Sequence, residues 1–348
     1  MLRKLVLGLA AAVALAGCGG SAAPSGSGSS SSSTCGTPLT FTVRLNWVLD
    51  DEQVPYYTAL DRGWYRDACL DPQFQPGRGS SDTVQLVANG SADVGIADSV
   101  AIVAGQAQGM DVTAFGVIYN HNPTAFLIRK AALPADQQGA DRLPVDALSG
   151  KTYGAVITGS PFIFWKGFAK KQGLDGKVRQ VNISPPGFAE MATGRVDFIA
   201  TFFTTAPVLE GMGVPLRVFK LEDYGQKAYG LSFLGGNKFL DAHPVQMRKF
   251  LEVTQRAIEF TNKNPEAGVR ALCKSNQALC ADDKALSTNV DEQRLQIPLY
   301  SNPVPGRPMF CADTTTWQAT QQLLLDAGTI TRAPDPAKTV TNRFLSGC

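Results

Sequence analysis

The sequence predicts an α/β fold of two similar lobes with a ligand cleft between them, and three observations support this prediction. Residues 79–98 (GSSDTVQLVANGSADVGIAD) have the pattern of a short helix that ends at Gly90 and is followed by an apolar strand. Residues 192–198 echo residues 88–94, because a glycine, an aspartate and an apolar strand recur in the same order. Strands also alternate with helices along most of the chain, which indicates parallel pairing with right-handed crossovers.

The N-terminus has the composition of a targeting segment. Two basic residues precede an apolar run, residues 5–16, which is too short for a comfortable membrane span. The run ends in Leu-Ala-Gly-Cys, which resembles the bacterial lipobox, so we expect residues 1–17 to be a lipoprotein signal peptide and Cys18 to carry the lipid. The alternative is an ordinary signal peptide whose cleavage site lies near a cysteine.

A tether is expected to follow the signal peptide. Residues 19–34 contain only Gly, Ser, Ala, Pro and Thr, and such a segment cannot bury a core, so residues 18–36 should be flexible. We therefore expect an extracytoplasmic protein that is anchored to the bacterial cell membrane by its N-terminal lipid and does not span it.

The charges of the chain are balanced. It has 32 Lys and Arg against 30 Asp and Glu, and loss of the signal peptide would leave 30 of each. A neutral chain with interspersed signs has no electrostatic footprint for nucleic acid, so nucleic acid is not an expected partner.

The cysteine count favours export. Six of the seven cysteines remain once Cys18 is set aside, and an exported chain with six cysteines predicts three disulfides. Six cysteines allow 15 pairings. Among them we favour Cys273–Cys280, which closes a short loop, Cys311–Cys348, which ties back the last residue, and Cys35–Cys69, which joins the starts of two strands.

The pattern of strands and helices divides the chain after the tether into three parts. Residues 37–123 form the first part of lobe 1, residues 124–228 form lobe 2, and residues 229–348 return to lobe 1 and add C-terminal helices. The expected strands are 39–45, 70–75, 94–97, 112–119, 124–129, 151–157, 178–182, 198–201, 215–221 and 229–234. The expected helices are 53–67, 83–88, 99–108, 160–172, 188–193, 206–211, 244–262, 265–274, 281–287 and 314–327.

Catalytic and metal-binding patterns fail. Residues 150–152 imitate the end of a phosphate-binding loop, but Val145 occupies the position where that motif needs glycine. The sequence contains no G-x-S-x-G, H-E-x-x-H or C-x-x-C, and it has only two histidines, His121 and His243. We therefore expect no enzyme activity, no cofactor and no metal site.

Polar and aromatic residues gather where ligands of open parallel sheets bind, outside the carboxyl ends of the strands and at helix N-termini. Hydroxyls, amides and rings of this kind suit a small polar or planar molecule. A single one of these residues is as well explained by helix capping or packing, but the set recurs in both lobes. The expected ligand-binding residues are Asn46, Trp47, Ser80, Ser81, Asp98, Ser99, Asn120, His121, Gly159, Ser160, Phe162, Phe202 and Thr204.

Several of these segments resemble a known family. The segments are residues 45–47 (LNW), 59–65 (ALDRGWY), 79–98, 109–112 (GMDV) and 148–151 (LSGK), together with the echo at 194–197. They resemble the NMT1/THI5-like group of extracytoplasmic solute-binding proteins, which serve ABC importers and include receptors for nitrate, taurine and alkanesulfonates. The resemblance covers about residues 39–234. It implies a type II periplasmic-binding-protein fold, with two crossovers between the lobes and closure around one solute.

The resemblance leaves two ligand classes open. Asn46-Trp47 looks most like members that bind thiamine pyrimidine precursors or related planar heterocycles. Those members often carry Glu-Pro where this chain has Ala206-Pro207, so the carboxylate that can accept from an aminopyrimidine is missing there. A nitrate, sulfonate or taurine receptor would use helix N-termini and often a cation, and Arg78 is the only obvious arginine near the expected cleft.

The implied function is that of a monomeric receptor. It would capture a small solute and deliver it to a membrane permease driven by a separate ATPase subunit. One rival is a secreted enzyme that uses His121 as a base, and another is a ligand-sensing surface receptor without a permease.

Overall fold

The computed structural model describes residues 36–140, 142–300 and 306–348. The expected signal peptide, Cys18, Cys35 and nearly all of the expected tether lie outside these residues. Within the described ranges, no helix is both long enough and apolar enough to cross a membrane.

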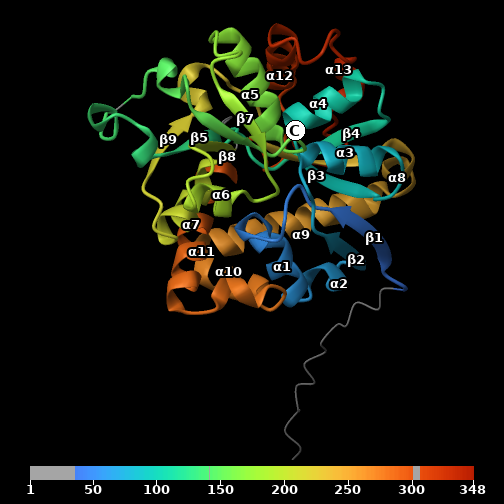
Figure 1. Cartoon of the computed structure of the whole chain (residues 1–348). Helices are drawn as coiled ribbons and strands as arrows, with labels where there is room; N and C mark the ends of the chain where they lie inside the picture. The colour runs from blue at the N-terminus through green and yellow to red at the C-terminus, as the bar shows by residue number, and fades with distance from the viewer. Residues whose placement is uncertain (1–35, 141, 301–305) are drawn as a thin grey trace, which may run out of the picture. The chain divides into compact units, whose positions relative to one another are not determined.

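Ten strands form two five-stranded sheets in the described part of the chain (Figure 1). The first sheet has the order β2 (Leu70–Gln75), β1 (Leu39–Arg44), β3 (Val94–Asp98), β10 (Leu231–Gly236) and β4 (Val112–Val117). The second has the order β7 (Arg179–Asn182), β6 (Thr152–Ala155), β8 (Phe198–Phe202), β5 (Thr124–Arg129) and β9 (Leu216–Lys220). The chain passes from the first sheet to the second between β4 and β5, and it returns to the first sheet between β9 and β10. Strands β5 and β10 are therefore the strands that follow the two crossovers between the lobes.

The two crossover strands depart from the parallel pairing that the alternation of strands and helices predicts. Strand β10 is antiparallel to both β3 and β4, and β5 is antiparallel to both β8 and β9. The pairs β1–β2, β1–β3, β6–β7 and β6–β8 are parallel, as expected. The two sheets therefore share one plan, in which a strand that arrives from the other lobe inserts antiparallel into a parallel sheet.

Helices cover both sheets, and two of the predicted helices need correction. The predicted helix 53–67 is divided into two helices, Val54–Asp61 and Trp64–Asp67, because Gly63 between them adopts a left-handed φ of 71°. The predicted helix 281–287 extends much further, to Gln296. The helices are α1 (Val54–Asp61), α2 (Trp64–Asp67), α3 (Ser80–Ala88), α4 (Ser99–Ala107), α5 (Ser160–Lys171), α6 (Phe188–Ala192), α7 (Ala206–Gly211), α8 (Asn237–Ala242), α9 (Pro244–Lys263), α10 (Pro265–Cys273), α11 (Asp283–Gln296), α12 (Thr314–Asp326) and α13 (Pro336–Thr339).

The repeated glycine–aspartate unit performs the same structural task in each lobe. Gly90 and Gly194 end their helices with left-handed φ angles of 78° and 74°. Three residues later, Asp93 Oδ2 accepts a hydrogen bond of 2.8 Å from the backbone N–H of Thr42 in β1. In the second lobe, Asp197 Oδ2 accepts one of 2.7 Å from the backbone N–H of Thr152 in β6. The repeat thus ties each helix end to the first parallel strand of its own sheet.

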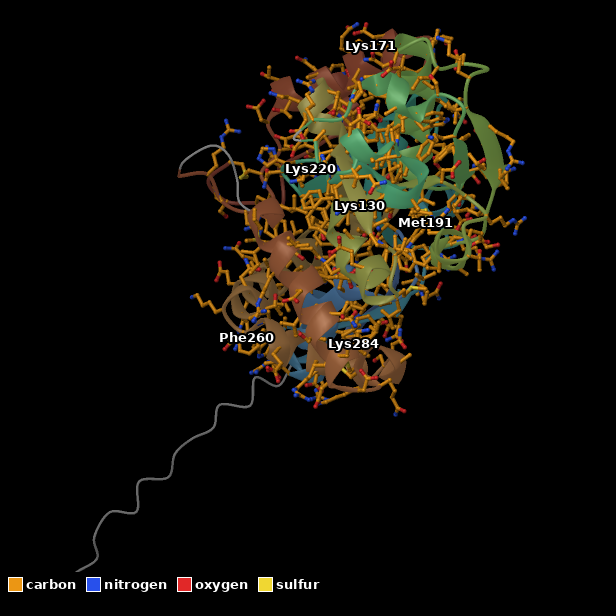
Figure 2. The ribbon with its side chains drawn as sticks, turned by 60° about the vertical axis from the view of Figure 1, so that its left-hand side comes forward. Lys130, Lys171, Met191, Lys220, Phe260 and Lys284 are labelled. Atoms are coloured by element: carbon orange, nitrogen blue, oxygen red, sulfur yellow. A yellow bond between two sulfur atoms is a disulfide. The ribbon has the colours of Figure 1, made fainter. Side chains whose placement is uncertain are left out.

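The two lobes touch away from the cleft as well. Helix α4 of the first lobe contacts α5 of the second, and α11 contacts α7. Lys284 on α11 (labelled in Figure 2) donates a hydrogen bond of 2.9 Å to the carbonyl of Gly211 at the end of α7. Helix α11 therefore links the second lobe to the 3₁₀ turn η1 (Asp51–Gln53) of the first, which it also contacts.

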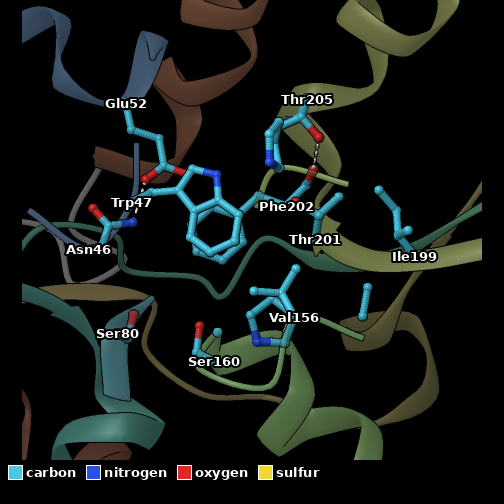
Figure 3. A pocket seen from close by; sticks show the side chains of 14 residues that line it. Asn46, Trp47, Glu52, Ser80, Val156, Ser160, Ile199, Thr201, Phe202 and Thr205 are labelled. Carbon is cyan, nitrogen blue, oxygen red and sulfur yellow. Dashed lines mark hydrogen bonds between the residues drawn. The ribbon is translucent and has the colours of Figure 1, made fainter. Parts of the chain in front are cut away.

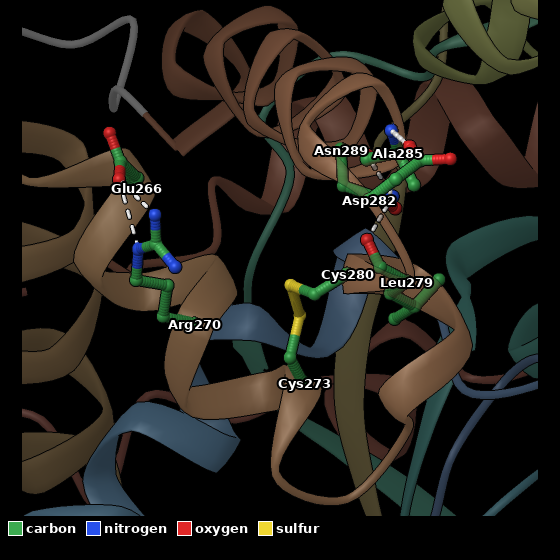
Figure 4. Close-up of a disulfide and its surroundings, with 8 residues drawn as sticks. All are labelled: Glu266, Arg270, Cys273, Leu279, Cys280, Asp282, Ala285 and Asn289. Atoms are coloured by element: carbon green, nitrogen blue, oxygen red, sulfur yellow. Dashed lines mark hydrogen bonds and ion pairs between the residues drawn. A yellow bond between two sulfur atoms is a disulfide. The ribbon is translucent and has the colours of Figure 1, made fainter.

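Two of the three disulfides favoured from the sequence are formed in the structure. Cys273 pairs with Cys280 at the end of α10 (Figure 4), and Cys311 pairs with Cys348. The pairing of Cys35 with Cys69 stays a prediction, because Cys35 lies outside the described residues.

Replacing Cys273 and Cys280 together by alanine is expected to lower the free energy of unfolding by about 2.5 kcal/mol, the loop-closure entropy of so short a loop. The two cysteines are only 7 positions apart. Chemical denaturation of the double variant and of the oxidised parent measures the difference. Free thiols at both positions in mass mapping of the oxidised protein would contradict the pairing.

Candidate functional site

A pocket lies between the two lobes, and the cavity inside it has a volume of about 30 Å³ (Figure 3). This is room for a water molecule, so a larger solute can enter only when the lobes move apart. The first lobe contributes Asn46, Trp47, Glu52 and Ser80. The second lobe contributes Val156, Gly159, Ser160, Pro161, Pro186, Ile199, Ala200, Thr201, Phe202 and Thr205.

The polar groups of the pocket stand where parallel strands end and helices begin. Asn46 and Trp47 follow β1, and Ser80 opens α3. Ser160 opens α5 in the second lobe, at the position equivalent to Ser80 in the first. The carboxyl ends of the strands meet at one edge of each sheet, so these residues gather at the cleft.

A glycine fixes the turn that carries Trp47. The backbone N–H of Gly77 donates a hydrogen bond of 2.7 Å to the carbonyl of Trp47. A Cβ atom at position 77 would lie 2.0 Å from the carbonyl oxygen of Leu45, so a side chain there cannot coexist with this approach. The close contact between the two loops holds the half-buried Trp47 ring at the pocket.

Direct contacts join the lobes at the rim of the pocket. The backbone N–H of Ser81 donates a hydrogen bond of 3.1 Å to the carbonyl of Thr158, and the Thr158 hydroxyl donates to the carbonyl of Arg78. Deeper in the cleft, the Ser160 side chain of lobe 2 lies close enough to the Asp98 carboxyl of lobe 1 to oppose, in part, the rise that burial causes in the pKa of Asp98. The helix N-termini of α3 and α5 therefore lie against each other.

Glu52 is the acidic group of the pocket wall. Its side chain is 6 % exposed, and Oε2 accepts a hydrogen bond of 2.6 Å from Asn46 Nδ2. The pKa of Glu52 is raised to about 8, mainly by burial; the Asn46 amide opposes the shift, and the nearby Asp51 and Asp98 add to it.

More carboxyl groups are buried behind Glu52. Burial raises the pKa of Asp51 to about 7, and it also raises the pKa values of Asp50 and of Glu292 on α11. Asp51 Oδ2 accepts a hydrogen bond from the Gln296 amide, and Gln296 Oε1 accepts one of 2.7 Å from the Tyr119 hydroxyl. None of the ion pairs among the described residues involves these four acids, Asp50, Asp51, Glu52 and Glu292.

The pocket wall carries no basic side chain. Lys, Arg and His are absent from the residues that line it within the described ranges. Arg78, the arginine expected nearest the cleft, has an exposed side chain and contributes its backbone carbonyl to the contact between the lobes. The one ionisable side chain among the described lining residues is therefore Glu52, whose raised pKa keeps it mainly protonated at neutral pH.

The structure brings together six of the expected ligand-binding residues and places seven outside the pocket wall. The six that line it are Asn46, Trp47, Ser80, Gly159, Ser160 and Phe202. The seven that do not are Ser81, Asp98, Ser99, Asn120, His121, Phe162 and Thr204.

Several of the expected residues that lie outside the pocket wall make hydrogen bonds to other groups of the protein. Asp98 is fully buried, and its oxygens accept from the backbone N–H of Val100 at 3.2 Å and from Asn122 Nδ2 at 2.7 Å. The Ser99 hydroxyl donates to the carbonyl of Tyr229. Asn120 Nδ2 is 3.5 Å from the carbonyl oxygen of Tyr300, so it too points to a partner in the fold.

The other expected residues lie in different surroundings. His121 is exposed and lines a separate depression beside the crossover segment that contains Ala228 and Tyr229. Phe162 on α5 packs against the hydrophobic core that includes other residues of the same helix. Thr204 is buried in the 3₁₀ turn that follows β8. Ser81 contributes its backbone N–H to the contact between the lobes.

Sequence reasoning missed the apolar wall of lobe 2 and Glu52. Ile199, Ala200 and Thr201 belong to β8, which was correctly predicted as a strand. That these residues of the strand line the cleft was not predicted. Glu52 stands between Asn46-Trp47 and the predicted helix 53–67, and its position six residues after Asn46 was the available signal.

The fold defines the class of protein. The alkanesulfonate-binding protein of Xanthomonas axonopodis pv. citri bound to MOPS superposes with a TM-score of 0.66 at 16 % identity, covering 88 % of this chain and 99 % of that one. The chain therefore has the periplasmic-binding-protein fold, two α/β lobes around a cleft.

The family follows from the sequence. The family model described as NMT1/THI5 like matches residues 51–268, and the chain belongs to this family. A formylaminopyrimidine-binding protein of Halalkalibacterium halodurans is 23 % identical over 292 residues, which are 80 % of this chain and 82 % of that protein. A 4-amino-5-hydroxymethyl-2-methylpyrimidine phosphate synthase of Candida albicans is 22 % identical over 249 residues, 64 % of this chain and 68 % of that one. The chain is thus similar both to a binding protein and to a protein named as a synthase.

Proposed function

We propose that this protein is the extracytoplasmic solute receptor of an ABC importer and that it binds a planar nitrogen heterocycle without transforming it. The observation that carries the proposal is the pocket itself. An indole ring, a phenyl ring, hydroxyl groups and one carboxyl group converge from both lobes on one pocket. A ligand that touches both lobes would favour the arrangement in which they meet.

The heterocycle is favoured over an anion by the lack of a positive charge in the wall. A sulfonate or nitrate ion in this pocket would find no lysine, arginine or histidine among the described lining residues to balance its charge. A flat ring can instead stack on Trp47 and hydrogen-bond to the surrounding oxygens. The formylaminopyrimidine-binding relative supports the same ligand class.

The receptor role is favoured over catalysis by the position of His121. The histidine that an enzyme of this kind would use as a base lies outside the pocket wall, on the exposed surface. Delivery to a permease with its own ATPase subunit, and anchoring through a lipid at Cys18, belong to the same proposal. They rest on the binding-protein relatives and on the N-terminal sequence.

A thermal-shift screen tests the proposal directly. Pyrimidines, flavins, alkanesulfonates, taurine and nitrate are added separately to the folded protein, because a ligand that binds the native state raises the melting temperature by mass action. The expected hit is a heterocycle that produces compaction in small-angle scattering and is recovered unchanged. Recovery of a converted product would contradict the receptor role.

Replacing Trp47 by leucine is expected to lower the affinity for the heterocycle about tenfold, since aromatic stacking contributes about 0.5–1.5 kcal/mol beyond area burial. Titration calorimetry with the compound found in the screen measures the change. Trp64→Leu is the matched control, because Trp64 packs against Phe260 and does not line the pocket. Equal affinities of Trp47→Leu and the parent would show that Trp47 does not contact the ligand.

A further inference from the structure

The indole ring of the pocket is carried by a segment without regular secondary structure. Residues 46–49 lie between β1 and the turn η1 and belong to no helix or strand. Two hydrogen bonds reach their backbone from elsewhere among the described residues. The N–H of Gly77 donates to the carbonyl of Trp47 at 2.7 Å. Asn276 Nδ2 donates to the carbonyl of Leu49 at 3.1 Å. The position of the ring therefore depends on two anchors, one at Trp47 itself and one two residues further on.

The anchor at Leu49 comes from a distant part of the chain. Asn276 and Leu49 are 227 positions apart. The half-buried side chain of Leu49 packs against the hydrophobic cluster that contains Leu272 and Cys273 at the end of α10. Leu49 is thus held through its carbonyl and through its side chain by the same region, the end of α10 and the loop that follows it.

This loop, residues 273–280, is itself fixed at both ends. The disulfide between Cys273 and Cys280 closes it (Figure 4). Near its second end, Asn289 Nδ2 of α11 donates a hydrogen bond of 3.0 Å to the carbonyl of Leu279. The amide of Asn276 is therefore presented to Leu49 by a loop that has little freedom to move.

The loop and Trp47 both lie in the first lobe. Helix α10, which leads into the loop, contacts α1 of the same lobe. The hold on Trp47 therefore does not require the lobes to be closed, and it should persist when they move apart to admit a solute. A ring that is already held in place loses less freedom when a solute stacks on it, and this favours binding.

We infer that loop 273–280, closed by its disulfide, holds Trp47 in its binding position before the solute arrives, and that Asn276 is the positioning residue through which it acts. Asn276 does not line the pocket. The inference rests on the proposed receptor function and adds a determinant of affinity that lies outside the pocket wall.

Acrylamide quenching of the ligand-free protein tests the hold on Trp47 without any solute. The emission of Trp47 is obtained by subtracting the emission of the Trp47→Phe variant. Asn276→Asp retains the size of the side chain but lacks the amide donor, and it is expected to raise the Stern–Volmer constant of Trp47 about twofold, because the segment opens locally. The double variant Cys273→Ala, Cys280→Ala should change the constant in the same direction.

Titration calorimetry with 4-amino-5-hydroxymethyl-2-methylpyrimidine as the probe measures the consequence for binding. Asn276→Asp is expected to lower the affinity for this probe about tenfold, because the carbonyl of Leu49 loses its donor and the ring is no longer held. In a Trp47→Leu background the same substitution should lower the affinity less than about twofold. A residue that acts through Trp47 has no further effect once that ring is absent, so the two substitutions should not be additive.

Asn264→Asp is the matched control. Asn264 Nδ2 also donates to a backbone carbonyl, that of Phe260 at 3.0 Å, but this bond stays within the end of α9. The control should keep the quenching and the affinity of the parent. Near-ultraviolet circular dichroism of each variant establishes that the fold is retained.

The outcomes separate this inference from the receptor proposal. Parent-like quenching of Trp47 in Asn276→Asp would overturn the inference. Equal losses of affinity from Asn276→Asp in the parent and in the Trp47→Leu background would overturn it as well, since the loss would then not pass through Trp47. A parent protein that binds neither the probe nor any compound of the screen would overturn the receptor proposal, while the quenching would still decide whether the loop positions Trp47.

Discussion

Replacing Gly79 with alanine is expected to weaken solute binding at least a hundredfold, about 2.7 kcal/mol, because the new side chain prevents the lobes from meeting. Gly79 precedes α3 with a φ of 131°, and a Cβ atom there would lie 2.4 Å from the carbonyl oxygen of Thr158 in the opposite lobe. That oxygen accepts the hydrogen bond from Ser81 that joins the two rims. The backbone at Thr158 cannot move aside without losing this contact.

Two measurements check the prediction. Calorimetry with the solute found in the screen gives the loss of affinity, and small-angle scattering should give a larger radius of gyration for Gly79→Ala than for the parent. Gly90→Ala is the control, since Gly90 also has a left-handed φ, 78°, but a Cβ atom there would have no neighbour within 4 Å. The Gly90→Ala variant should be less stable than the parent and should bind the solute with the same affinity. Parent-like affinity of Gly79→Ala would show that binding does not require the contact at Thr158.

Much of the fold could be predicted from the sequence, because the residues that determine it lie close together in the chain. The glycine that ends each helix and the aspartate three residues later are adjacent in the chain, and their hydrogen bonds to Thr42 and Thr152 repeat once per lobe. The direction of β5 and β10 could not be obtained in the same way. An apolar run such as residues 124–129 pairs equally well in either direction, and the direction is decided by where the chain arrives from the other lobe.

The polar residues of the candidate site were only partly predictable, because sequence position does not reveal which hydrogen bonds are already made. Ser80 and Ser160 start helices at the cleft and line the pocket. Asp98 ends a strand of the same sheet, yet Asn122 and Val100 occupy its oxygens. Asn122 follows in the chain by 24 positions, and nothing in the intervening pattern indicates that the two side chains meet.

Glu52 was missed for a related reason. In the sequence it lies next to a predicted amphipathic helix, where a glutamate most often belongs to the solvated face. Its burial depends on tertiary packing of the turn η1 against α11, which carries Glu292 and lies some 240 positions later in the chain. A contact of that sequence separation leaves no local signature.

The stability of the protein is expected to be highest in mildly acidic solution and to fall steeply as the pH rises from about 5 to 8.5. Burial raises the pKa values of Asp51 and Asp98 to about 7 and that of Glu52 to about 8, and it also raises those of Asp50 and Glu292. In the unfolded chain such groups titrate near pH 4.

The sign follows from proton uptake. Between about pH 4 and 8 the folded protein holds protons that the unfolded chain has released, so the free energy of unfolding decreases as the pH rises. Each group that titrates alone contributes a slope of about 1.4 kcal/mol per pH unit. Asp51 and Glu52 also repel each other electrostatically, so their protons leave in successive steps and the decrease is spread over the window.

Thermal melting in buffers from pH 5 to 8.5 measures this decrease, and we expect the melting temperature to fall by about 10 °C or more, at about 2 °C per kcal/mol for a chain of this size. The double variant Asp51→Asn, Glu292→Gln removes two of the buried acids and should flatten the profile, with its gain over the parent largest at pH 8.5. Asp283→Asn, an exposed acid at the start of α11, should leave the profile unchanged. A parent melting temperature that rises steadily from pH 5 to 8.5 would show that these carboxyls are ionised in the folded protein, and would require a bound cation or a more open cleft.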